Sequence, residues 1–526
     1  MPSRTNDDVA SSSSSSSSVA GPSKASGSTL PPILPLSAFP NPGTPIHEKP
    51  SGYTFYKEVL NSSKYIVAPM VSASELPWRT LSRRYGADLC YSPMINCRSL
   101  VDSLHGKSKN SRAKALEWFD VDLGEEGSGE DKMLVVQLAG SDPKIILEAA
   151  EHVQDHCLAV DLNLGCPQHI AKRGHYGSYL QEDWPLIFNI INTLHLNLRI
   201  PVTAKMRVFD DVERTVAYAK MLQHAGAQIV TVHGRTREQK GHKTGVADWE
   251  KIRAVKQALD VPVFANGNIL YGEDLQSALD KTGADGVMSA EGNLYNPTIF
   301  STSDLREKLP THLFPHRTDG PEPNPEWAPF PYIPAIAHAY LDEVVQCKTR
   351  TEPGAVKGHI FKICRPALER HTDIRANIGK AKLLHLEEGQ DRGVVVKEYR
   401  EAMDLLDERL MVDRKDSTFS SAPTGTSKHI PPSEQRYLPH WLCQPYFRPP
   451  LAEPAAEAKQ AKGVKEVGAT GAASGDGTAG AGAVPVKSNG MVDPADVQTE
   501  GEKRVMMDEN EEADQGGNDA KRIRVR

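Results

Sequence analysis

The chain has 526 residues and a formal net charge of −7, so it exceeds one ordinary domain and its overall charge gives no sign of nucleic-acid binding. No apolar core of signal-peptide length follows an N-terminal charge cluster, and no stretch approaches the roughly 20 apolar residues that span a bilayer. These features argue against a secreted or membrane protein. We expect a soluble intracellular protein of the cytoplasm, the nucleus or both.

Both ends of the chain are expected to be disordered. Residues 1–50 contain an unbroken serine run and many prolines, a composition that cannot bury enough apolar surface to offset the entropy of ordering. Residues 451–526 are rich in Ala, Gly, Glu and Lys without hydrophobic periodicity, and they end in the basic run Lys521–Arg526. We interpret that run as a solvated charge cluster, with a nuclear import signal or a nucleic-acid contact as the alternatives.

Eight short apolar runs between Tyr65 and Gly292 predict the strands of one sheet. Each ends at or beside a Gly, Pro, Asn or charged residue, and a segment of helical period follows it, as in Pro143–His156 and Asp211–Ala225. Because the runs show no alternation, they are typical of strands buried on both faces. The runs are Tyr65–Met70, Ala87–Met94, Leu134–Gly140, Ala159–Leu164, Val202–Arg207, Ile229–Gly234, Val263–Asn268 and Gly286–Ala290.

Strands that alternate with helices in this number predict an α/β fold, a (β/α)8 TIM barrel over residues 60–325, since such barrels need about 250 residues. A doubly wound open sheet is the alternative, and we favour the barrel because no GxGxxG motif follows the first strand. The acidic, glycine-rich segment Gly124–Asp131 precedes the third run. We interpret it as a surface insertion without a chemical role.

Beyond the barrel the sequence has only helical patterns, which predict a smaller all-α domain over residues 330–415. The patterns cover Ala335–Cys347, Ala355–Arg370 and Val395–Met411. Residues 428–450 contain too many prolines for a helix or a sheet, yet they carry Trp441, Tyr446 and Phe447. We expect this segment to pack as an extended arm against the folded body.

Charge is distributed unevenly, and the helical domain carries a local basic face. Between Pro353 and Lys382 the two acids, Glu369 and Asp373, are outnumbered by Lys and Arg. The basic residues are Lys357, Lys362, Arg365, Arg370, Arg375, Lys380 and Lys382. A basic face on an acidic protein indicates a contact with nucleic-acid phosphates.

The seven cysteines include no CxxC pair or zinc-like grouping, so we expect neither structural disulfides nor a metal site. Cys166 differs from the others because it follows a predicted strand within Asn163-Leu164-Gly165-Cys166-Pro167. Gly and Pro turn the chain there and can hold a thiol over the barrel mouth. We interpret the other six as packing residues.

Polar side chains follow nearly every predicted strand, and in such a barrel these strand ends converge on one site. They are Pro69 and Met70, Gln137, Asn163 and Cys166, Lys205 and Arg207, His233, Arg235 and Arg237, Asn266-Gly267-Asn268, and Ala290-Glu291-Gly292. Amides, a lysine, a histidine and glycine-rich turns suit flavin mononucleotide (FMN). Gln137 and Lys205 can match the pyrimidine edge of the ring, and backbone N–H groups after the last two strands can hold the phosphate.

A reduced flavin beside a thiol can saturate a conjugated double bond. In uracil, hydride from flavin N5 reaches C6 and leaves negative charge on C5 and O4, and a thiol such as Cys166 can deliver the proton to C5. Arg207, Arg235 and Arg237, with His233, can stabilise charge on the uracil carbonyls or hold phosphates. Salt bridges to acids of neighbouring loops are the alternative interpretation of these cations.

With these motifs in view, the sequence from about Tyr65 to Ala381 resembles the tRNA-dihydrouridine synthases, FMN-containing barrels with a C-terminal helical RNA-binding domain. The resemblance rests on Ala68-Pro69-Met70, Asn163–Pro167, Lys205-Met206-Arg207, His233-Gly234-Arg235-Thr236 and Asn266-Gly267-Asn268. It implies that Cys166 is the proton donor. The flavin-binding residues it leads us to expect are Pro69, Met70, Val71, Gln137, Asn163, Lys205, His233, Asn266, Gly267, Asn268, Ala290, Glu291 and Gly292.

Three further segments are similar to the eukaryotic branch that acts at positions 16 and 17 of the tRNA D-loop. They are Arg173-Gly174-His175-Tyr176-Gly177, Met288–Gly292 and Lys357-Gly358-His359. Many relatives have Gly-Arg where this chain has Ala290-Glu291, a departure that fits this branch and leaves phosphate contact to the backbone.

The resemblance also implies NADPH, or NADH, as the electron donor, and tRNA as the substrate. Without a Rossmann fingerprint, the nicotinamide is expected to approach the flavin transiently, with uridine taking its place afterwards. The uridine must be extruded from the folded tRNA at a cost of a few kcal/mol. The basic face, with Lys357, Lys362 and Arg365, is expected to supply that energy through phosphate contacts.

Two other functions remain open from the sequence, and we expect a monomer in each case. One is a flavin barrel that reduces or oxidises a free pyrimidine, as the dihydroorotate dehydrogenases do. The other is a tRNA-binding or folding factor whose barrel no longer reduces anything. The helical domain argues against the first, and the intact flavin and thiol set argues against the second.

Overall fold

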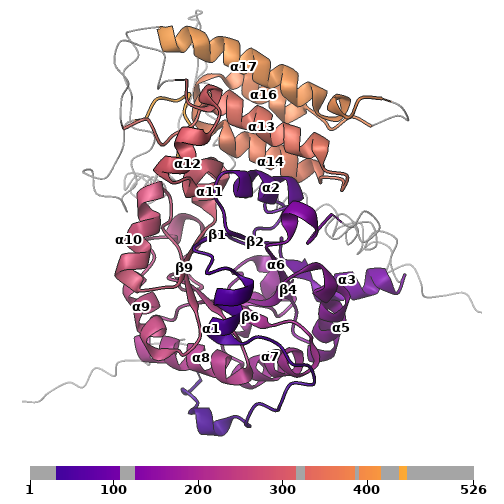
Figure 1. Cartoon of the computed structure of the whole chain (residues 1–526), viewed down its shortest axis with the longest axis vertical. Helices are drawn as coiled ribbons and strands as arrows, with labels where there is room; N and C mark the ends of the chain where they lie inside the picture. Colours follow the sequence, from indigo (N-terminus) through magenta and orange to yellow (C-terminus); the bar gives the residue numbers. More distant parts are fainter. Residues whose placement is uncertain (1–30, 107–124, 316–325, 386–389, 416–437, 447–526) are drawn as a thin grey trace, which may run out of the picture.

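A computed structural model describes residues 31–106, 125–315, 326–385, 390–415 and 438–446 of the chain. Figure 1 shows a barrel surrounded by helices and, stacked on one side of it, a layer of longer helices from the C-terminal part. The expected disorder of residues 451–526 and the packing of Phe447 concern segments outside the described residues.

The nine strands form one parallel sheet that closes on itself. Their order is β2-β1-β9-β8-β7-β6-β5-β4-β3, and β2 also pairs with β4, which completes the ring. This closure confirms the predicted TIM barrel and rules out the open sheet. The strands are β1 Tyr65–Val67, β2 Leu89–Tyr91, β3 Ile95–Asn96, β4 Leu134–Ala139, β5 Ala159–Leu164, β6 Val202–Arg207, β7 Val230–His233, β8 Val263–Asn266 and β9 Gly286–Ser289. The second predicted strand, Ala87–Met94, contains β2 only, and β3 begins directly after it.

Helices cover the outside of the barrel, and aspartate caps start several of them. Asp142 accepts the backbone N–H of Lys144, and Asp211 accepts that of Arg214, so the two helices expected in these stretches begin at capped positions. Residues Gln154–His156 continue the first as a 3-10 turn. The helices of this part are α1 Gly52–Thr54, α2 Leu76–Arg84, α3 Cys97–Leu104, α5 Pro143–Val153, α6 His169–Arg173, α7 Trp184–Asn197, α8 Val212–Ala225, α9 Trp249–Ala258, α10 Gly272–Thr282, α11 Glu291–Tyr295 and α12 Ser303–Lys308.

The C-terminal part is helical throughout its described residues, as predicted. Its elements are α13 Ile333–Gln346, α14 Pro353–Ile363, α15 Arg365–Arg370, α16 Thr372–Lys380, η10 Arg392–Val396 and α17 Lys397–Lys415. The single helix expected over Ala355–Arg370 is two helices, because Pro366 has no N–H to donate to the carbonyl of Lys362. Within these described ranges no helix is long and apolar enough to cross a membrane.

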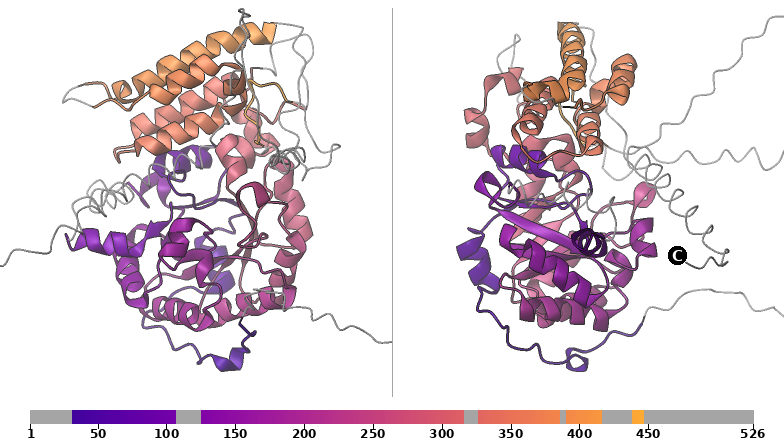
Figure 2. Two further views of the ribbon diagram at one scale, coloured as in Figure 1. Left: turned by 180° about the vertical axis from the view of Figure 1, so that it is seen from behind. Right: turned by 90° about the vertical axis from the view of Figure 1, so that its right-hand side faces the viewer.

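Residues 31–50 differ from the predicted disordered tail. They run over the outside of α7 and α8, on the side of the barrel away from the helical layer (Figure 2), where Phe39 stacks on Phe188 of α7 with 5.3 Å between ring centroids. The Lys49 ammonium donates to the carbonyls of His195 and Leu198 at 2.6 and 2.7 Å. Prolines lower the entropy cost of an extended path, so a few apolar and polar anchors suffice to hold it.

The helical layer and the barrel share one buried core. Glu75, the residue before α2, accepts hydrogen bonds from the Tyr340 hydroxyl at 2.8 Å and His359 Nε2 at 3.1 Å. Trp78 of α2 stacks on His359 with ring centroids 4.0 Å apart, and both side chains are fully buried. Burial disfavours the Glu75 carboxylate, yet the contact with His359 and the Tyr340 hydroxyl keep its pKa below the usual value.

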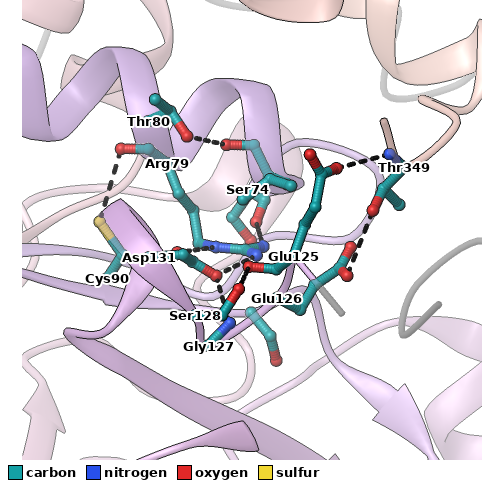
Figure 3. Close-up of polar contacts among 12 residues, drawn as sticks. Ser74, Arg79, Thr80, Cys90, Glu125, Glu126, Gly127, Ser128, Asp131 and Thr349 are labelled. Atoms are coloured by element: carbon teal, nitrogen blue, oxygen red, sulfur yellow. Dashed lines mark hydrogen bonds and ion pairs between the residues drawn. The ribbon is translucent and has the colours of Figure 1, made fainter. Parts of the chain in front are cut away.

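The acidic segment before the third predicted strand is not a surface insertion, and that prediction is wrong for its described residues. Asp131 is 2% exposed and accepts Arg79 Nε and Nη2 at 3.1 and 2.9 Å, as Figure 3 shows. Glu125 and Glu126 reach the helical layer, where they accept from the backbone N–H and the hydroxyl of Thr349. The segment therefore joins α2 to the loop between α13 and α14.

Candidate active site

Four adjacent strands bring the predicted site residues together at their carboxyl ends. Asn163 of β5 lies opposite Lys205 of β6 in the strand register. Arg207 of β6 pairs with His233 of β7, which in turn pairs with Asn266 of β8. The barrel therefore places these side chains around one opening, as the sequence predicted.

Two amides connect β4 and β5 to the loop after β5, Gly165–Pro167, which we call the thiol loop. Asn163 Nδ2 donates to Gln137 Oε1 at 2.7 Å. Asn163 Oδ1 accepts the backbone N–H groups of Gly165 and Cys166 at 3.1 and 3.0 Å. One side chain thus fixes two successive peptide groups of the thiol loop.

The carbonyls of the thiol loop are also bonded. Arg207 Nε donates to the Gly165 carbonyl at 2.7 Å, and the backbone N–H and hydroxyl of Ser178 donate to the Cys166 carbonyl at 3.1 and 2.9 Å. The Pro167 carbonyl accepts from the Tyr179 hydroxyl at 3.2 Å and the Lys240 ammonium at 2.8 Å. With both donors and acceptors fixed, the loop holds Cys166 in one orientation.

Burial favours the protonated form of the Cys166 thiol. The side chain is half-buried, and burial raises the pKa of the thiol, against the opposing effects of the Gln168 backbone N–H and of Arg207. A raised pKa keeps the group in the S–H form. All seven cysteines are free thiols, and of the six interpreted as packing residues only Cys157 is not fully buried.

Gly177 is required beside the thiol loop. Its φ is +64°, and a Cβ there would lie 2.8 Å from the Cys166 carbonyl oxygen and 3.0 Å from the Cys166 Cβ. We expect Gly177→Ala to displace the thiol and to lower the rate of a reaction that uses this thiol by at least about tenfold, since misplacement by about 1 Å can cost 10²-fold. Gly129→Ala is the matched control, because Gly129 also has a positive φ but nothing within 4 Å of its Cβ position. Equal turnover in both variants would contradict this role.

Burial lowers the pKa of two basic groups of the site, Lys205 on β6 and His233 on β7. Lys205 Nζ donates to Asn266 Oδ1 at 2.9 Å, and burial lowers the pKa of its ammonium to about 8. Burial also lowers the pKa of His233 well below its usual value, and Arg235 Nη1 lies 3.3 Å from His233 Nε2. Because a guanidinium can only donate, His233 is neutral with its proton on Nδ1.

The remaining predicted flavin residues lie in the segments that follow β1, β8 and β9. After β1, Pro69 and Met70 are half-buried and Val71 is 40% exposed. After β8, Gly267 has a φ of +111°, and a Cβ there would lie 2.7 Å from the Cβ of Ala247. After β9 the chain continues from half-buried Ala290 and Glu291 to buried Gly292 in α11.

Two of the predicted substrate cations are bonded within the protein. Arg235 donates to the Gly245 carbonyl and to Oδ1 of Asn268, whose side chain also accepts from the N–H of Ala247. Arg237 forms ion pairs with Glu182 at 2.8 Å and Glu238 at 3.1 Å. These contacts match the salt-bridge alternative for Arg237 and make Arg235 part of the wall around His233.

Comparison with known proteins agrees with this arrangement. A family model described as Dihydrouridine synthase (Dus) matches residues 66–317. A Saccharomyces cerevisiae protein named tRNA-dihydrouridine(16/17) synthase, whose name also carries NAD(P)(+), is 43% identical over 387 residues, 73% of this chain and 83% of that protein.

The chain belongs to the dihydrouridine synthase family. A Schizosaccharomyces pombe protein of the same name is 40% identical over 407 residues, 76% of this chain and 92% of that protein. A Mus musculus protein, whose name is the same with the suffix "-like", is 39% identical over 409 residues, 78% of this chain and 73% of that protein. The similarity therefore extends beyond the barrel of this dihydrouridine synthase.

In this dihydrouridine synthase the predicted tRNA-binding residues of α14 and α15 differ in their surroundings. Lys357 and Lys362 are half-buried, and their ammonium groups donate to the carbonyls of Gly379 at 2.8 Å and Gly358 at 3.4 Å. The Arg365 side chain is 13% exposed, and its guanidinium lies 3.5 Å from the ring centroid of Tyr446. The arm thus covers one face of Arg365.

The described part of the arm, residues 438–446, packs between the two parts of the enzyme. Leu442 forms an antiparallel bridge with Tyr332, and Leu442 and Cys443 are fully buried.

His440 Nε2 and His371 Nε2 lie 2.7 and 3.0 Å from the same carboxylate oxygen, Oδ2 of Asp413. Two imidazoles and a carboxylate are a donor set for a transition metal. The same distances are also those of two imidazole N–H groups that each donate a hydrogen bond to Asp413 Oδ2.

Several residues of the site were not selected from the sequence. Ser178, Tyr179 and Lys240 come from segments without a strand-end pattern, so only the fold brings them to the thiol loop. Asp161 did carry a signal, because it is the one charged residue in the apolar run Ala159–Leu164. A buried acid inside a barrel strand requires a partner.

Proposed function

We propose that this enzyme reduces the C5=C6 bond of uridine in tRNA to dihydrouridine, with FMN as the bound flavin and NADPH or NADH as the electron donor. The observation that carries the proposal is the place of the Cys166 thiol, on a loop whose peptide groups are hydrogen-bonded on both sides, directly after β5 in a barrel of this family. The names of the fungal and mouse relatives suggest positions 16 and 17.

The residues at the mouth fit a flavin. Among the described residues, the Lys205 ammonium donates to a single acceptor, Asn266 Oδ1. An ammonium has three donors, and burial lowers its pKa to about 8, so it favours a further electron-rich oxygen such as O2 of a flavin. Bound FMN in its reduced form supplies a hydride to C6 of uracil.

The protein supplies the proton and the orientation. Cys166 holds the proton for C5 of the uracil, and its raised pKa keeps that proton in place at neutral pH. Arg207 acts mainly on the thiol loop, because its guanidinium donates to the carbonyls of Gly165 and Thr236. Lys205 and the neutral His233 complete the flavin side of the opening. Lys357 and Lys362 on α14 would meet tRNA phosphates.

This function is tested with the purified full chain and unmodified tRNA. We expect a yellow protein with the absorbance of oxidised FMN, which NADPH or NADH bleaches. We also expect dihydrouridine, mapped by reverse transcription or mass spectrometry, in the D-loop at positions 16 and 17. Comparable turnover of free uridine would favour the free-pyrimidine alternative, and a colourless protein that binds tRNA would favour the non-catalytic one.

A further inference from the structure

A chain of side-chain hydrogen bonds runs from the barrel interior to the thiol loop. Asp161 of β5 is 1% exposed, and its Oδ1 accepts from the Thr203 hydroxyl at 2.7 Å. Its Oδ2 accepts from Gln137 Nε2 at 2.8 Å. Gln137 Oε1 accepts from Asn163 Nδ2 at 2.7 Å, and Asn163 Oδ1 accepts the two N–H groups of the thiol loop.

The chain has one permitted direction, which Asp161 requires at one end and the N–H groups of the thiol loop require at the other. An ionised carboxylate can only accept, so Gln137 must turn its NH₂ group toward Asp161 and its oxygen toward Asn163. Asn163 must then present its NH₂ group to Gln137 and its oxygen to the thiol loop. Only this order gives the backbone N–H groups of Gly165 and Cys166 an acceptor, because a reversed Asn163 would face them with a donor.

We propose that Asp161 is a positioning residue, which orients the Cys166 thiol through the order of hydrogen bonds that it imposes on Gln137 and Asn163. This proposal rests on the proposed function, since both concern the Cys166 thiol. The hydrogen bonds that Asp161 accepts come from Gln137 and Thr203, so its effect on the thiol loop passes through the two amides.

The surroundings of Asp161 agree with an acceptor at neutral pH. Burial raises the pKa of its carboxyl to about 6, and the hydrogen bonds from Gln137 and Thr203 and the charge of Lys205 oppose that rise. The group is therefore ionised at pH 7 and above. Burying a charged carboxylate is unfavourable in free energy, and two hydrogen bonds on separate oxygens offset part of that penalty.

Asp161→Asn tests the direction while keeping the shape. The new side chain can either accept from Gln137 or donate to it, so it no longer excludes the reversed order of both amides, in which the N–H groups of Gly165 and Cys166 face a donor. We expect dihydrouridine formation to fall by about 10- to 100-fold, consistent with a displaced reacting group. We also expect Cys166 to react with iodoacetamide about tenfold faster in the absence of tRNA, because the loop opens more often. Peptide mass spectrometry identifies the labelled cysteine.

A charge exchange within the chain is the sharper test. In the double variant Asp161→Asn with Gln137→Glu, the carboxylate stands at position 137. It accepts from the NH₂ groups of residues 161 and 163, so Asn163 keeps its native direction. We expect iodoacetamide labelling of Cys166 to return to within about twofold of the unsubstituted protein. Thr203→Val is the matched control, since it removes a donor to Asp161 without reversing the amides, and it too should label at the native rate.

The outcomes separate this proposal from the proposed function. Absence of dihydrouridine with the unsubstituted enzyme would overturn the function, whereas labelling rates measure the loop alone. Asp161→Asn labelling at the native rate, or Thr203→Val labelling as fast as Asp161→Asn, would overturn the positioning role. If Asp161→Asn fails to fold, native-like labelling of the double variant supports the proposal, and failure of the double variant to fold contradicts it.

Discussion

Replacing Cys166 with alanine is expected to lower the rate of dihydrouridine formation by about 10²- to 10⁴-fold, the usual contribution of a general acid. The variant should still bind FMN and be reduced by NADPH at the native rate, since the thiol acts only on the uracil. A single-turnover experiment, in which prereduced enzyme is mixed with unmodified tRNA and flavin reoxidation is followed, separates the two half-reactions.

Cys157→Ala is the matched control for this substitution. Cys157 is also a free and only partly buried thiol, but it lies after α5, and its sulfur contacts the Val153 carbonyl. We expect its turnover to stay within about twofold of the unsubstituted enzyme. Normal product yield from Cys166→Ala would remove the proton-donor assignment and leave solvent as the source of the proton.

Asp131→Ala is expected to destabilise the fold by about 3–5 kcal/mol, the typical cost of breaking one side of a buried ion pair. Asp131 accepts from Arg79 and pairs with Arg83 at 2.6 Å, so its removal leaves a buried guanidinium without its counter-charge. Urea denaturation at pH 7 measures the loss. Asp155→Ala, which removes an exposed pair with Arg199, should cost less than about 1 kcal/mol.

The contribution of Asp131 also has a definite pH dependence. Burial disfavours its carboxylate, but Arg79 and Arg83 hold the pKa below the usual value. A group whose folded-state pKa is lowered stabilises the fold above the unfolded pKa of about 3.9 and loses that effect as pH falls through the folded value. The difference between the unsubstituted protein and Asp131→Ala should therefore shrink below about pH 4. A constant difference down to pH 2 would contradict the ionic account.

The barrel could be predicted because its signals are local. Uninterrupted apolar runs such as Ala159–Leu164 and Val202–Arg207 form strands with those same bounds, since a strand buried on both faces needs no distant partner to be recognised. The acidic segment before β4 was misinterpreted for the opposite reason. Its burial depends on Arg79, which lies 52 residues from Asp131 in sequence, and composition carries no information about such a partner.

The site was predicted as a set of strand ends, but not as a network. The residue types at Asn163, Lys205 and His233 point to a polar opening, and the register brings them side by side. Whether a strand-end cation faces a ligand or a carbonyl depends on loop paths that periodicity does not reveal. Arg207 is the clearest case, because its guanidinium is directed at the carbonyls of Gly165 and Thr236.

The stack of Trp78 on His359 bears on how such enzymes can be recombined. The outer face of α2 is core for the helical layer, and Trp78, Leu81 and Val287 belong to the same buried cluster as Ile336, Tyr340 and Ile360. The barrel and the helical layer therefore cannot be exchanged between relatives independently of each other. A chimaera that takes its helical layer from a relative must also take the outer surface of α2, or it will leave the indole ring of Trp78 without its stacking partner.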